Sequence, residues 1–409
     1  MSEWREVRLG DLCYKVCSGG TPKSTCSAYY DGGTIPWLNT KEINYNRIYQ
    51  TESHITEEGL NNSSAKWIDA NSVIVAMYGA TAGRVAVAKI PMTTNQACCN
   101  LMIDKSKADY NFIYYYLSNN YKHLLSMANG AAQQNLNAQV IKDFIVSLPE
   151  IDEQHRISSF LSSLDDKIAV NRRICENLEA QAQALFKHWF IDFAPFLDKP
   201  SGKAERKNGN FVESELGMIP EGWRVGTLTE IAEYLNGLAM QKFPPLSADD
   251  AIPVLKIKEL GQSQCDDSSD KCSKQIKPEY IINNGDVVFS WSGTLMVDIW
   301  CGGICGLNQH LFKVTSDHYP KWFYLMWTKH HLAEFIRIAK DKAVTMGHIK
   351  RGDLEKALVA IPDSDTLDKM SKVMEDIHNQ IINTRLESNS LSTLRDTLLP
   401  KLMSGQIKV

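Results

Sequence analysis

The sequence lacks most of the motifs that would assign an enzymatic activity. No G-x-x-x-x-G-K-[ST] loop is present, which argues against nucleotide hydrolysis by that route, and neither H-E-x-x-H nor C-x-x-C occurs. The double-proline motif and glycine-rich cofactor loop of an amino-methyltransferase are also missing. No uncharged apolar stretch reaches the roughly 18 residues that a membrane-spanning helix needs. These absences point away from a catalytic or membrane-embedded protein.

An excess of positive charge is also missing. The chain has 44 Lys and Arg residues and 48 Asp and Glu residues, which gives a formal net charge of −4. Such a chain has no overall positive field to hold nucleic acid non-specifically. Any DNA binding must come from local patches. The length of 409 residues leaves room for two or three globular units.

The ten cysteines do not indicate a disulfide scaffold, because they lie in a large chain that starts without a basic or apolar leader. We expect reduced thiols and a cytoplasmic location. Cys13 with Cys17, and Cys301 with Cys305 near His310, have a spacing that could supply half of a metal site. Buried thiols explain this spacing more simply, so no metal site is expected.

The sequence contains the same helical pattern in two places. Two regions carry mostly apolar or small residues at alternating steps of three and four, the pattern of a seam between packed helices. The first seam comprises Leu161, Leu164, Ile168, Asn171, Cys175, Leu178, Ala182, Leu185 and Trp189, and the second comprises Met374, Ile377, Ile381, Thr384, Ser388, Leu391, Arg395, Leu398 and Leu402. We expect two long helices that pair in antiparallel orientation. Asn171 and Thr384 are either register-setting polar groups or solvated seam ends.

The repeat extends beyond the helices. Residues 35–43 share Ile, Pro, Leu, Lys and Glu with residues 252–260, residues 73–79 match residues 287–293, and Asn95-Gln96 matches Asn308-Gln309. Strands with a tight turn are expected within residues 71–87 and 286–300, and helices within 112–125 and 322–338. Asp363 and Asp365 are expected to cap the second long helix.

The fold class expected is therefore α+β, with two similar globular units joined by two long, antiparallel coiled-coil helices in a pseudo-two-fold arrangement. The predicted boundaries are residues 1–150 for the first unit, 151–193 for the central helix, 194–215 for a polar linker, 216–362 for the second unit and 363–409 for the C-terminal helix.

The duplicated plan, the closing segment 391–407, the central segment 185–193 and the segment 217–223 resemble the DNA specificity subunit of type I restriction-modification systems. The resemblance covers essentially the whole chain. It implies two target recognition domains, each reading one half of a bipartite asymmetric DNA sequence, with helices that set the spacer. It also implies a non-catalytic subunit that directs methyltransferase subunits, two in number, and motor-nuclease subunits to double-stranded DNA. S-adenosylmethionine, ATP and Mg then belong to those partners, and no cofactor belongs to this chain.

Candidate DNA contacts are polar, basic or aromatic residues in predicted loops, since base edges and phosphates need hydrogen-bonding groups and cations. In the first half they are Thr21, Lys23, Asn39, Lys41, Tyr78, Arg84, Gln133, Gln134 and Asn135, and in the second half Lys256, Lys258, Trp291, Ser292, His348 and Lys350. The three consecutive amides of the first half suit adenine. The amide pairs at 95–96 and 308–309 are either base readers or buried loop ties. Arg84 and Lys258 could be solvated charges, and Trp37 and Trp291 core aromatics.

Phe186, Trp189 and Phe190 form an apolar end of the central helix and are candidates for binding a partner subunit. Packing inside the chain is the alternative. Two rival functions are a standalone enzyme that modifies or cleaves DNA, and a coiled-coil scaffold without DNA affinity.

Overall fold

A computed structural model describes residues 4–127, 135–197, 211–341 and 347–409. The chain divides into two compact units, which we call the first unit (residues 1–167 and 391–409) and the second unit (residues 168–390). Two long helices, α5 (Ile151–Phe186) and α10 (Ser364–Met403), contribute to both. A single π-helical turn, Lys187–Ile191, follows α5.

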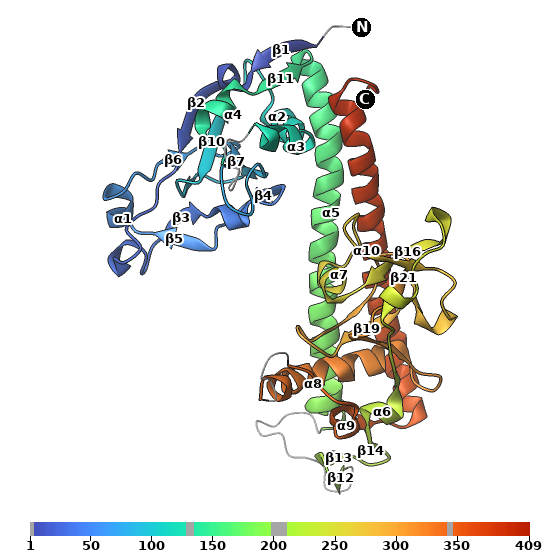
Figure 1. The fold of residues 1–409 in the computed structure, drawn as a ribbon. Coiled ribbons are helices and arrows are strands. Elements are labelled where there is room, and N and C mark those ends of the chain that lie inside the picture. Colours follow the sequence, from blue (N-terminus) through green and yellow to red (C-terminus); the bar gives the residue numbers. More distant parts are fainter. Residues whose placement is uncertain (1–3, 128–134, 198–210, 342–346) are drawn as a thin grey trace. The chain divides into compact units, whose positions relative to one another are not determined.

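The first unit contains a two-stranded, a five-stranded and a four-stranded sheet (Figure 1). Their strand orders are β1 (Arg5–Arg8) with β11 (Ile145–Leu148); β2 (Cys13–Ser18), β10 (Cys98–Ile103), β7 (Val73–Ala76), β8 (Val85–Ala88) and β4 (Asn46–Ile48); and β5 (Ser53–Ile55), β3 (Ile35–Leu38), β9 (Met92–Thr94) and β6 (Trp67–Ile68). Its short helices are α1 (Glu57–Asn61), α2 (Tyr110–Asn119), α3 (Tyr121–Ser126) and α4 (Ala138–Asp143).

The second unit repeats this plan. Its strand orders are β14 (Arg224–Thr227) with β23 (Leu358–Ile361); β15 (Glu233–Asn236), β22 (Leu311–Thr315), β19 (Val287–Ser290) and β20 (Met296–Ile299); and β17 (Lys271–Ser273), β16 (Ala251–Leu255), β21 (Cys305–Leu307) and β18 (Ile281–Ile282). The hairpin of β12 (Phe211–Ser214) and β13 (Gly217–Pro220) precedes them, and β12 lies inside the range predicted as linker. The helices are α6 (Leu228–Ile231), α7 (Ile257–Gln262), α8 (Lys321–Asp341) and α9 (Arg351–Glu355).

The two topologies correspond strand by strand. In the sheet β5-β3-β9-β6 and in its counterpart β17-β16-β21-β18, one parallel pair, β3 with β9 or β16 with β21, lies between antiparallel neighbours. The expected strands with a tight turn are β7–β8 and β19–β20, and their connections contain Gly79, Gly83 and Gly293 with positive φ. One strand differs: β4 pairs in parallel with β8, whereas β20 has no such neighbour among the described residues.

Both faces of the central sheets are buried, which is why their strands are continuous apolar runs rather than alternating ones. In β7, Val73 and Val75 belong to one core cluster, while Ile74 and Ala76 belong to another. Successive side chains of a strand point to opposite faces, so one short strand joins two cores. In β19, Val287 and Val288 are divided in the same way.

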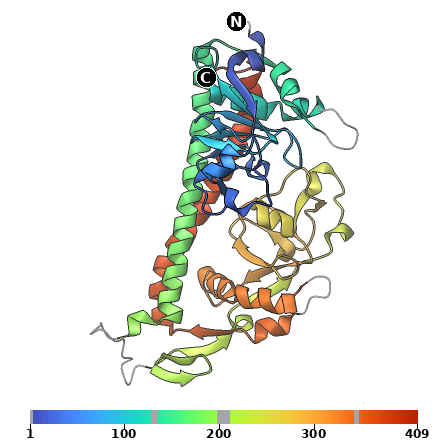
Figure 2. The ribbon, with the colours of Figure 1, turned by 90° about the vertical axis from the view of Figure 1, so that its left-hand side faces the viewer.

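The two long helices lie side by side in both views (Figures 1 and 2). In the second unit, Asn171 Nδ2 donates to Glu387 Oε2 at 2.8 Å and the Cys175 thiol lies 3.8 Å from the carbonyl oxygen of Ile381. Residue numbers rise along α5 while those of its contacts fall along α10, so the pairing is antiparallel, as predicted. Asn171 is 1% exposed and therefore is not a solvated seam end.

The start of α10 is capped as expected. Asp363 Oδ1 accepts a hydrogen bond from the backbone N–H of Thr366 at 2.9 Å, and these hydrogen bonds lower the pKa of the Asp363 carboxyl. Among the described residues, no helix has an apolar stretch of the length and charge content that crossing a bilayer requires.

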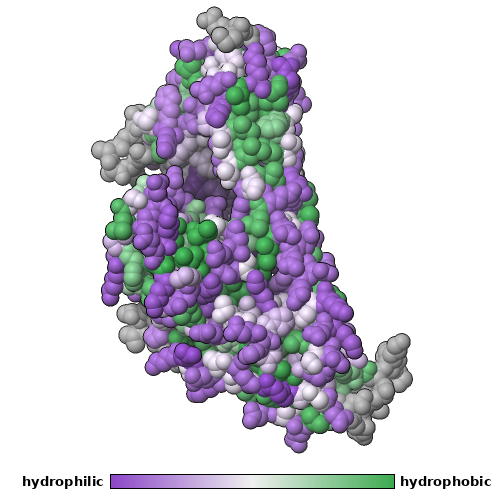
Figure 3. All heavy atoms as spheres, turned by 90° about the vertical axis from the view of Figure 1, so that its right-hand side faces the viewer, coloured by the Kyte–Doolittle hydropathy of each residue, from purple (hydrophilic) through white to green (hydrophobic). Residues whose placement is uncertain are grey.

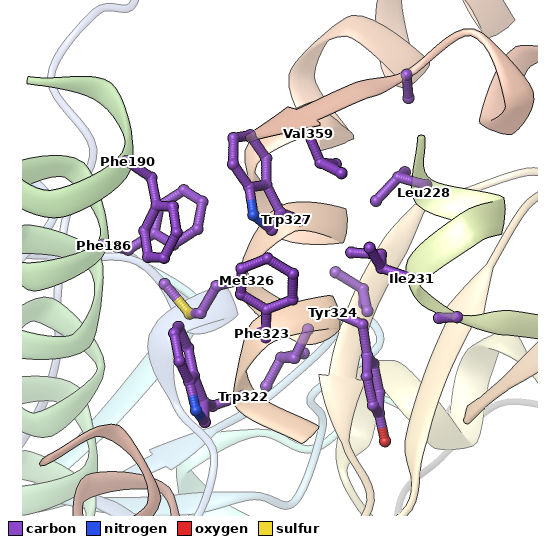
Figure 4. Packing of buried hydrophobic residues seen from close by; sticks show 14 of the residues in the cluster. Phe186, Phe190, Leu228, Ile231, Trp322, Phe323, Tyr324, Met326, Trp327 and Val359 are labelled. Carbon is purple, nitrogen blue, oxygen red and sulfur yellow. The ribbon is translucent and has the colours of Figure 1, made fainter. Parts of the chain in front are cut away.

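The aromatic end of α5 packs mainly inside the chain. Phe186 and Phe190 are buried, and their rings point toward helix α8 (Figure 4). The ring centroid of Phe186 is 5.0 Å from that of Trp327, and the centroid of Phe190 is 5.4 Å from that of Trp223. Trp189 is half-buried against the same cluster. For Phe186 and Phe190 the partner-binding interpretation is therefore replaced by the alternative, packing inside the chain, because a buried ring has no surface to offer a partner; Trp189, which is half-buried, stays a candidate.

Candidate nucleic-acid interface

Four strand ends of the first unit meet at one edge of its central sheet. The pairings of Cys99 with Ser18, Cys98 with Ala76 and Val75 with Val85 bring the ends of β2 and β7 beside the starts of β10 and β8. The parallel pair β3–β9 adds its C-terminal end, since the backbone N–H of Asn95 donates to the carbonyl of Leu38 at 2.9 Å. Loops that are distant in sequence therefore converge here, and we call this the first edge.

The first edge collects most of the residues predicted for the first half. Thr21 is hydrogen-bonded to Gln96 through their side chains, and the Tyr78 hydroxyl donates to the carbonyl of Gln96 at 3.0 Å. Burial raises the pKa of Tyr78, so its hydroxyl stays protonated and remains a donor. Asn39 lies within 3.4 Å of the Asn95 amide, measured from Nδ2 to Oδ1.

Arg84 and Asn135 also belong to the first edge. Arg84 Nη1 donates to Asn44 Oδ1 at 2.9 Å, which holds the guanidinium over the loop before β4. Asn135 is exposed, and the next residue, Leu136, donates its backbone N–H to the carbonyl of Met77 at 2.8 Å. Gln133 and Gln134 lie outside the described residues.

The two residues of the Asn-Gln pair that recurs in both halves have different roles. Asn95 Oδ1 accepts the backbone N–H of Ala97 at 3.1 Å, and Asn308 Oδ1 accepts that of His310 at 3.3 Å. Each asparagine thus ties its own loop, which is the structural alternative considered from the sequence. Gln96, by contrast, is exposed, as the base-reading alternative considered from the sequence requires.

The equivalent second edge carries different side chains. Trp291 Nε1 donates to Asn236 Oδ1 at 2.9 Å, so this half-buried tryptophan is held in the surface layer of the unit. The Ser292 hydroxyl lies 3.2 Å from Nδ1 of His310, an exposed residue that sequence reasoning did not select as a DNA contact. In contrast, Trp37 is buried, and its Nε1 donates to the carbonyl of Gly20 at 2.9 Å.

His348 occupies the place that Asn135 occupies in the first unit. The backbone N–H of Ile349 donates to the carbonyl of Trp291 at 3.1 Å, the counterpart of the contact between Leu136 and Met77. The His348 ring is exposed and lies 6.3 Å from that of Trp291, between centroids. The same frame therefore presents an amide in one unit and an imidazole in the other.

Several predicted lysines already have acidic neighbours. Lys41 Nζ is 2.7 Å from Glu52, Lys256 forms an ion pair with Asp270, and Lys258 Nζ is 3.5 Å from Asp266. The hydrogen bond from Lys256 lowers the pKa of the Asp270 carboxyl, which keeps the pair charged. Lys23 and Lys350 are exposed. The paired lysines are therefore weaker candidates for phosphate contacts, because a neighbouring carboxylate repels a phosphate.

The two edges offer hydrogen-bonding groups and cations. Across the described ranges, no three His, Cys, Asp or Glu side chains converge in a way that could hold a metal ion. Cys301 and Cys305 are buried, and burial raises the pKa of the Cys13 thiol to about 12. Such a thiol stays protonated and is a poor nucleophile. The arrangement suits recognition of a polar, anionic ligand.

Two segments of the chain, residues 1–180 and 220–391, match the family described as the type I restriction modification DNA specificity domain. The chain belongs to this family. Each matched segment contains one globular part and most of the long helix that follows it. Membership confirms the resemblance found in the sequence, the internal repeat and DNA sequence specificity as the function.

Relatives of this chain match it along its full length. The type I restriction enzyme MjaIX specificity subunit of Methanocaldococcus jannaschii is 29% identical over 424 residues, which cover 100% of this chain and 94% of the relative. The HindI specificity subunit of Haemophilus influenzae is 19% identical over 470 residues that span both chains entirely. The crystal structure of a type I restriction-modification S subunit from M. genitalium has a TM-score of 0.57 at 16% identity, over 98% of this chain and 96% of that one. This likeness confirms the predicted fold class.

Proposed function

We propose that this chain reads a bipartite, asymmetric double-stranded DNA sequence and that each globular unit contacts one half-site. One observation carries the proposal: equivalent positions of the two edges hold unlike side chains, Tyr78 and Asn135 in one and Ser292 and His348 in the other. Each base pair presents its own pattern of donors and acceptors in the major groove. Two units with the same fold but different hydrogen-bonding groups therefore suit two half-sites of different sequence.

Within each edge we assign the amide and imidazole groups to bases and the cations to phosphates. Asn135, with Gln133 and Gln134, suits adenine, which offers N7 as acceptor and N6 as donor. Gln96 can make the same pair of bonds. Among the other candidates, Lys23, Arg84 and Lys350 would position the backbone without reading sequence. Changing the three consecutive amides at 133–135 together to Ala should weaken cognate binding and relax one half-site only.

The long helices are proposed to set the unread spacer. Helix α5 has 36 residues, which corresponds to about 54 Å at 1.5 Å per residue. Half-sites read from one face of DNA lie about 34 Å, or roughly ten base pairs, apart. Inserting one heptad into both helices should change the accepted spacing and leave the half-site sequences unchanged. If the accepted spacing stayed the same, the helices would not determine the spacer length.

We further propose that the chain is non-catalytic and works in a cytoplasmic complex with two methyltransferase subunits and with motor-nuclease subunits. S-adenosylmethionine, ATP and Mg would then bind to those partners. Apolar side chains near the end of α10 are candidates for a partner surface in place of Phe186 and Phe190: Leu394 is 44% exposed, and Leu398 and Leu399 are half-buried. Figure 3 shows hydrophobic side chains gathered on part of the first unit.

Methyl transfer to DNA separates the proposal from its rivals. The chain alone should transfer no methyl groups, and the chain with its methyltransferase partner should methylate and protect one bipartite sequence. Transfer by the isolated chain would favour a standalone enzyme. A complex that assembles but protects no defined sequence would favour a scaffold without DNA affinity.

A further inference from the structure

A charged network in the first unit joins the globular part to both long helices. Arg47, on strand β4, directs Nη2 to the hydroxyls of Tyr115 at 3.0 Å and Ser162 at 2.8 Å, and its Nη1 lies 3.4 Å from Asp165 Oδ2. The other carboxylate oxygen of Asp165 accepts a hydrogen bond from Arg395 Nη1 on α10 at 2.7 Å. We call Arg47, Tyr115, Asp165 and Arg395 the first joint.

The first joint is largely shielded from water. The side chain of Arg47 is 12% exposed and that of Asp165 is 13% exposed. Charge-assisted hydrogen bonds in such surroundings are shorter and stronger than neutral ones. Removing one member leaves a shielded charge with only part of its compensation, which costs more than breaking a surface ion pair. The joint is therefore sensitive to the sign of each charge.

The second unit has a charged network of its own, in which the globular part contributes an anion. Arg385, on α10, contacts Glu179 Oε1 of α5 at 2.6 Å through Nη2. Its Nη1 donates to Asp298 Oδ2 of strand β20 at 3.1 Å and to the carbonyl of Ile299 at 3.0 Å. One helical turn on, Asn389 Nδ2 donates to the carbonyl of Cys301 at 2.8 Å. We call Glu179, Asp298 and Arg385 the second joint.

In both joints a carboxylate of α5 meets an arginine of α10, but the globular part adds a cation in the first and an anion in the second. We propose that these two joints are positioning devices of opposite globular charge, which fix each recognition unit on the long helix that follows it. The device rests on the proposed function, since the purpose of positioning is to present each edge to its half-site.

The two joints take their globular charge from different strands of the sheet. Strand β4, which carries Arg47, pairs with β8 and extends the first sheet toward the helices. Among the described residues of the second unit no strand lies beyond β20, so this strand itself supplies the charged residue, Asp298. The two joints also use different positions of the paired helices, since the order of the two seams matches Asp165 to His378 and Arg385 to Arg172. Each joint therefore belongs to its own unit and is not a copy of the other.

Amide hydrogen exchange on the full-length chain tests whether the joints hold the units. Arg47→Met should raise exchange in β8 roughly tenfold without affecting β20, and Asp298→Asn should do the reverse, because a shielded helix charge loses its contact with the globular part. Charge reversal, Arg47→Glu or Asp298→Lys, should act more strongly than neutralisation, and Arg47→Lys more weakly. Arg8→Met and Asp341→Asn are matched controls, since their ion pairs are exposed and should leave exchange unchanged.

Methylation of a duplex library tests whether the joints position the edges for DNA. The probes carry the native half-sites with spacers of native length or one base pair shorter or longer. In complex with the methyltransferase, Arg47→Met should retain the base preferences at both half-sites, while its relative activity on the altered spacers rises about tenfold over that of the wild type. Arg8→Met should behave as wild type.

Several results would overturn the inference. The inference fails if amide exchange is unchanged in the variants, if it rises equally in both units, or if charge reversal raises it no more than neutralisation does. It also fails if spacer selectivity stays at the wild-type level in a variant whose exchange has risen. If the wild-type complex methylates no bipartite sequence, the proposed function fails, whereas the exchange comparison still decides whether the joints hold the units.

Discussion

The two globular units share a frame and differ at its edge. Each has a central sheet buried on both faces, a second sheet with one parallel pair, and a strand pair that leads into a long helix. At equivalent places the first unit presents Tyr78 and Asn135, and the second presents Ser292 and His348. The comparison teaches that the frame is set by buried residues while the edge is free to vary. On the proposed function, a change of edge residues alters a half-site without altering the frame.

The cores show a second difference. The end of α5 closes the core of the second unit with Phe186 and Phe190, whereas the end of α10 closes that of the first with Leu402 and Met403. Each long helix thus starts in one unit and finishes in the core of the other. This exchange ties the folding of each unit to both helices.

Removing an aromatic ring from the second core should produce the largest effect. Phe190→Ala should cost about 3 to 5 kcal/mol, because the site is buried among five aromatic rings and leaves a cavity. Urea unfolding and amide exchange should show the loss in the second unit. The neighbouring Ile191→Ala, at a side chain that is 40% exposed, is the control with a small effect. Normal stability of Phe190→Ala would restore the partner-surface interpretation.

Exchanging the exposed groups of one edge should change one half-site. His348→Ala should lose roughly 1 to 3 kcal/mol of discrimination at one base pair of one half-site, and Asn135→Ala a similar amount in the other. Methylation of duplexes with single substitutions measures both. Relaxation of the same half-site by both variants would break the assignment of one unit to one half-site.

Acid should destabilise the second unit through its buried histidines. Burial lowers the pKa of His330, His331 and His378 from the ordinary value of 6.5. Below that value the unfolded chain binds more protons than the folded unit, so stability falls as the pH drops. His378→Gln should reduce the change in unfolding free energy between about pH 7 and pH 5. An unaltered pH profile in this variant would show that His378 does not contribute.

The smallest effects are expected at phosphate contacts. Lys23→Gln should weaken binding to all sequences alike and reduce the salt slope by about one. Lys41→Gln should change it less, because Lys41 already pairs with Glu52. Binding measured across a range of salt concentrations compares the two. An equal loss in both variants would mean that Glu52 does not screen Lys41 from the backbone.

Much of the frame was predictable because it is periodic. The seam from Leu161 to Trp189 and its copy, the strand pairs near residues 73 and 287, and the cap at Asp363 all depend on local spacing. Periodicity could not predict what buries Phe186 and Phe190. An apolar helix end has the same sequence pattern whether a partner or the chain itself covers it. The joints at Arg47 and Asp298 were also missed, because each pairs residues far apart in sequence.

The recognition edges were only partly predictable. Turn residues indicated the loops, and Thr21, Tyr78 and Arg84 do lie together. Sequence could not show that Asn95 ties its loop while Gln96 is exposed, or that Lys256 faces Asp270. Both depend on which loops the sheet brings together.

The most direct test of the two-unit account is a methylome comparison of cells with and without this chain, in the presence of its methyltransferase partner. The account predicts one new methylated sequence with two unlike half-sites separated by an unread spacer, and a single altered half-site when His348→Ala replaces the wild type. A continuous or palindromic site, or an alteration of both half-sites in that variant, would contradict it.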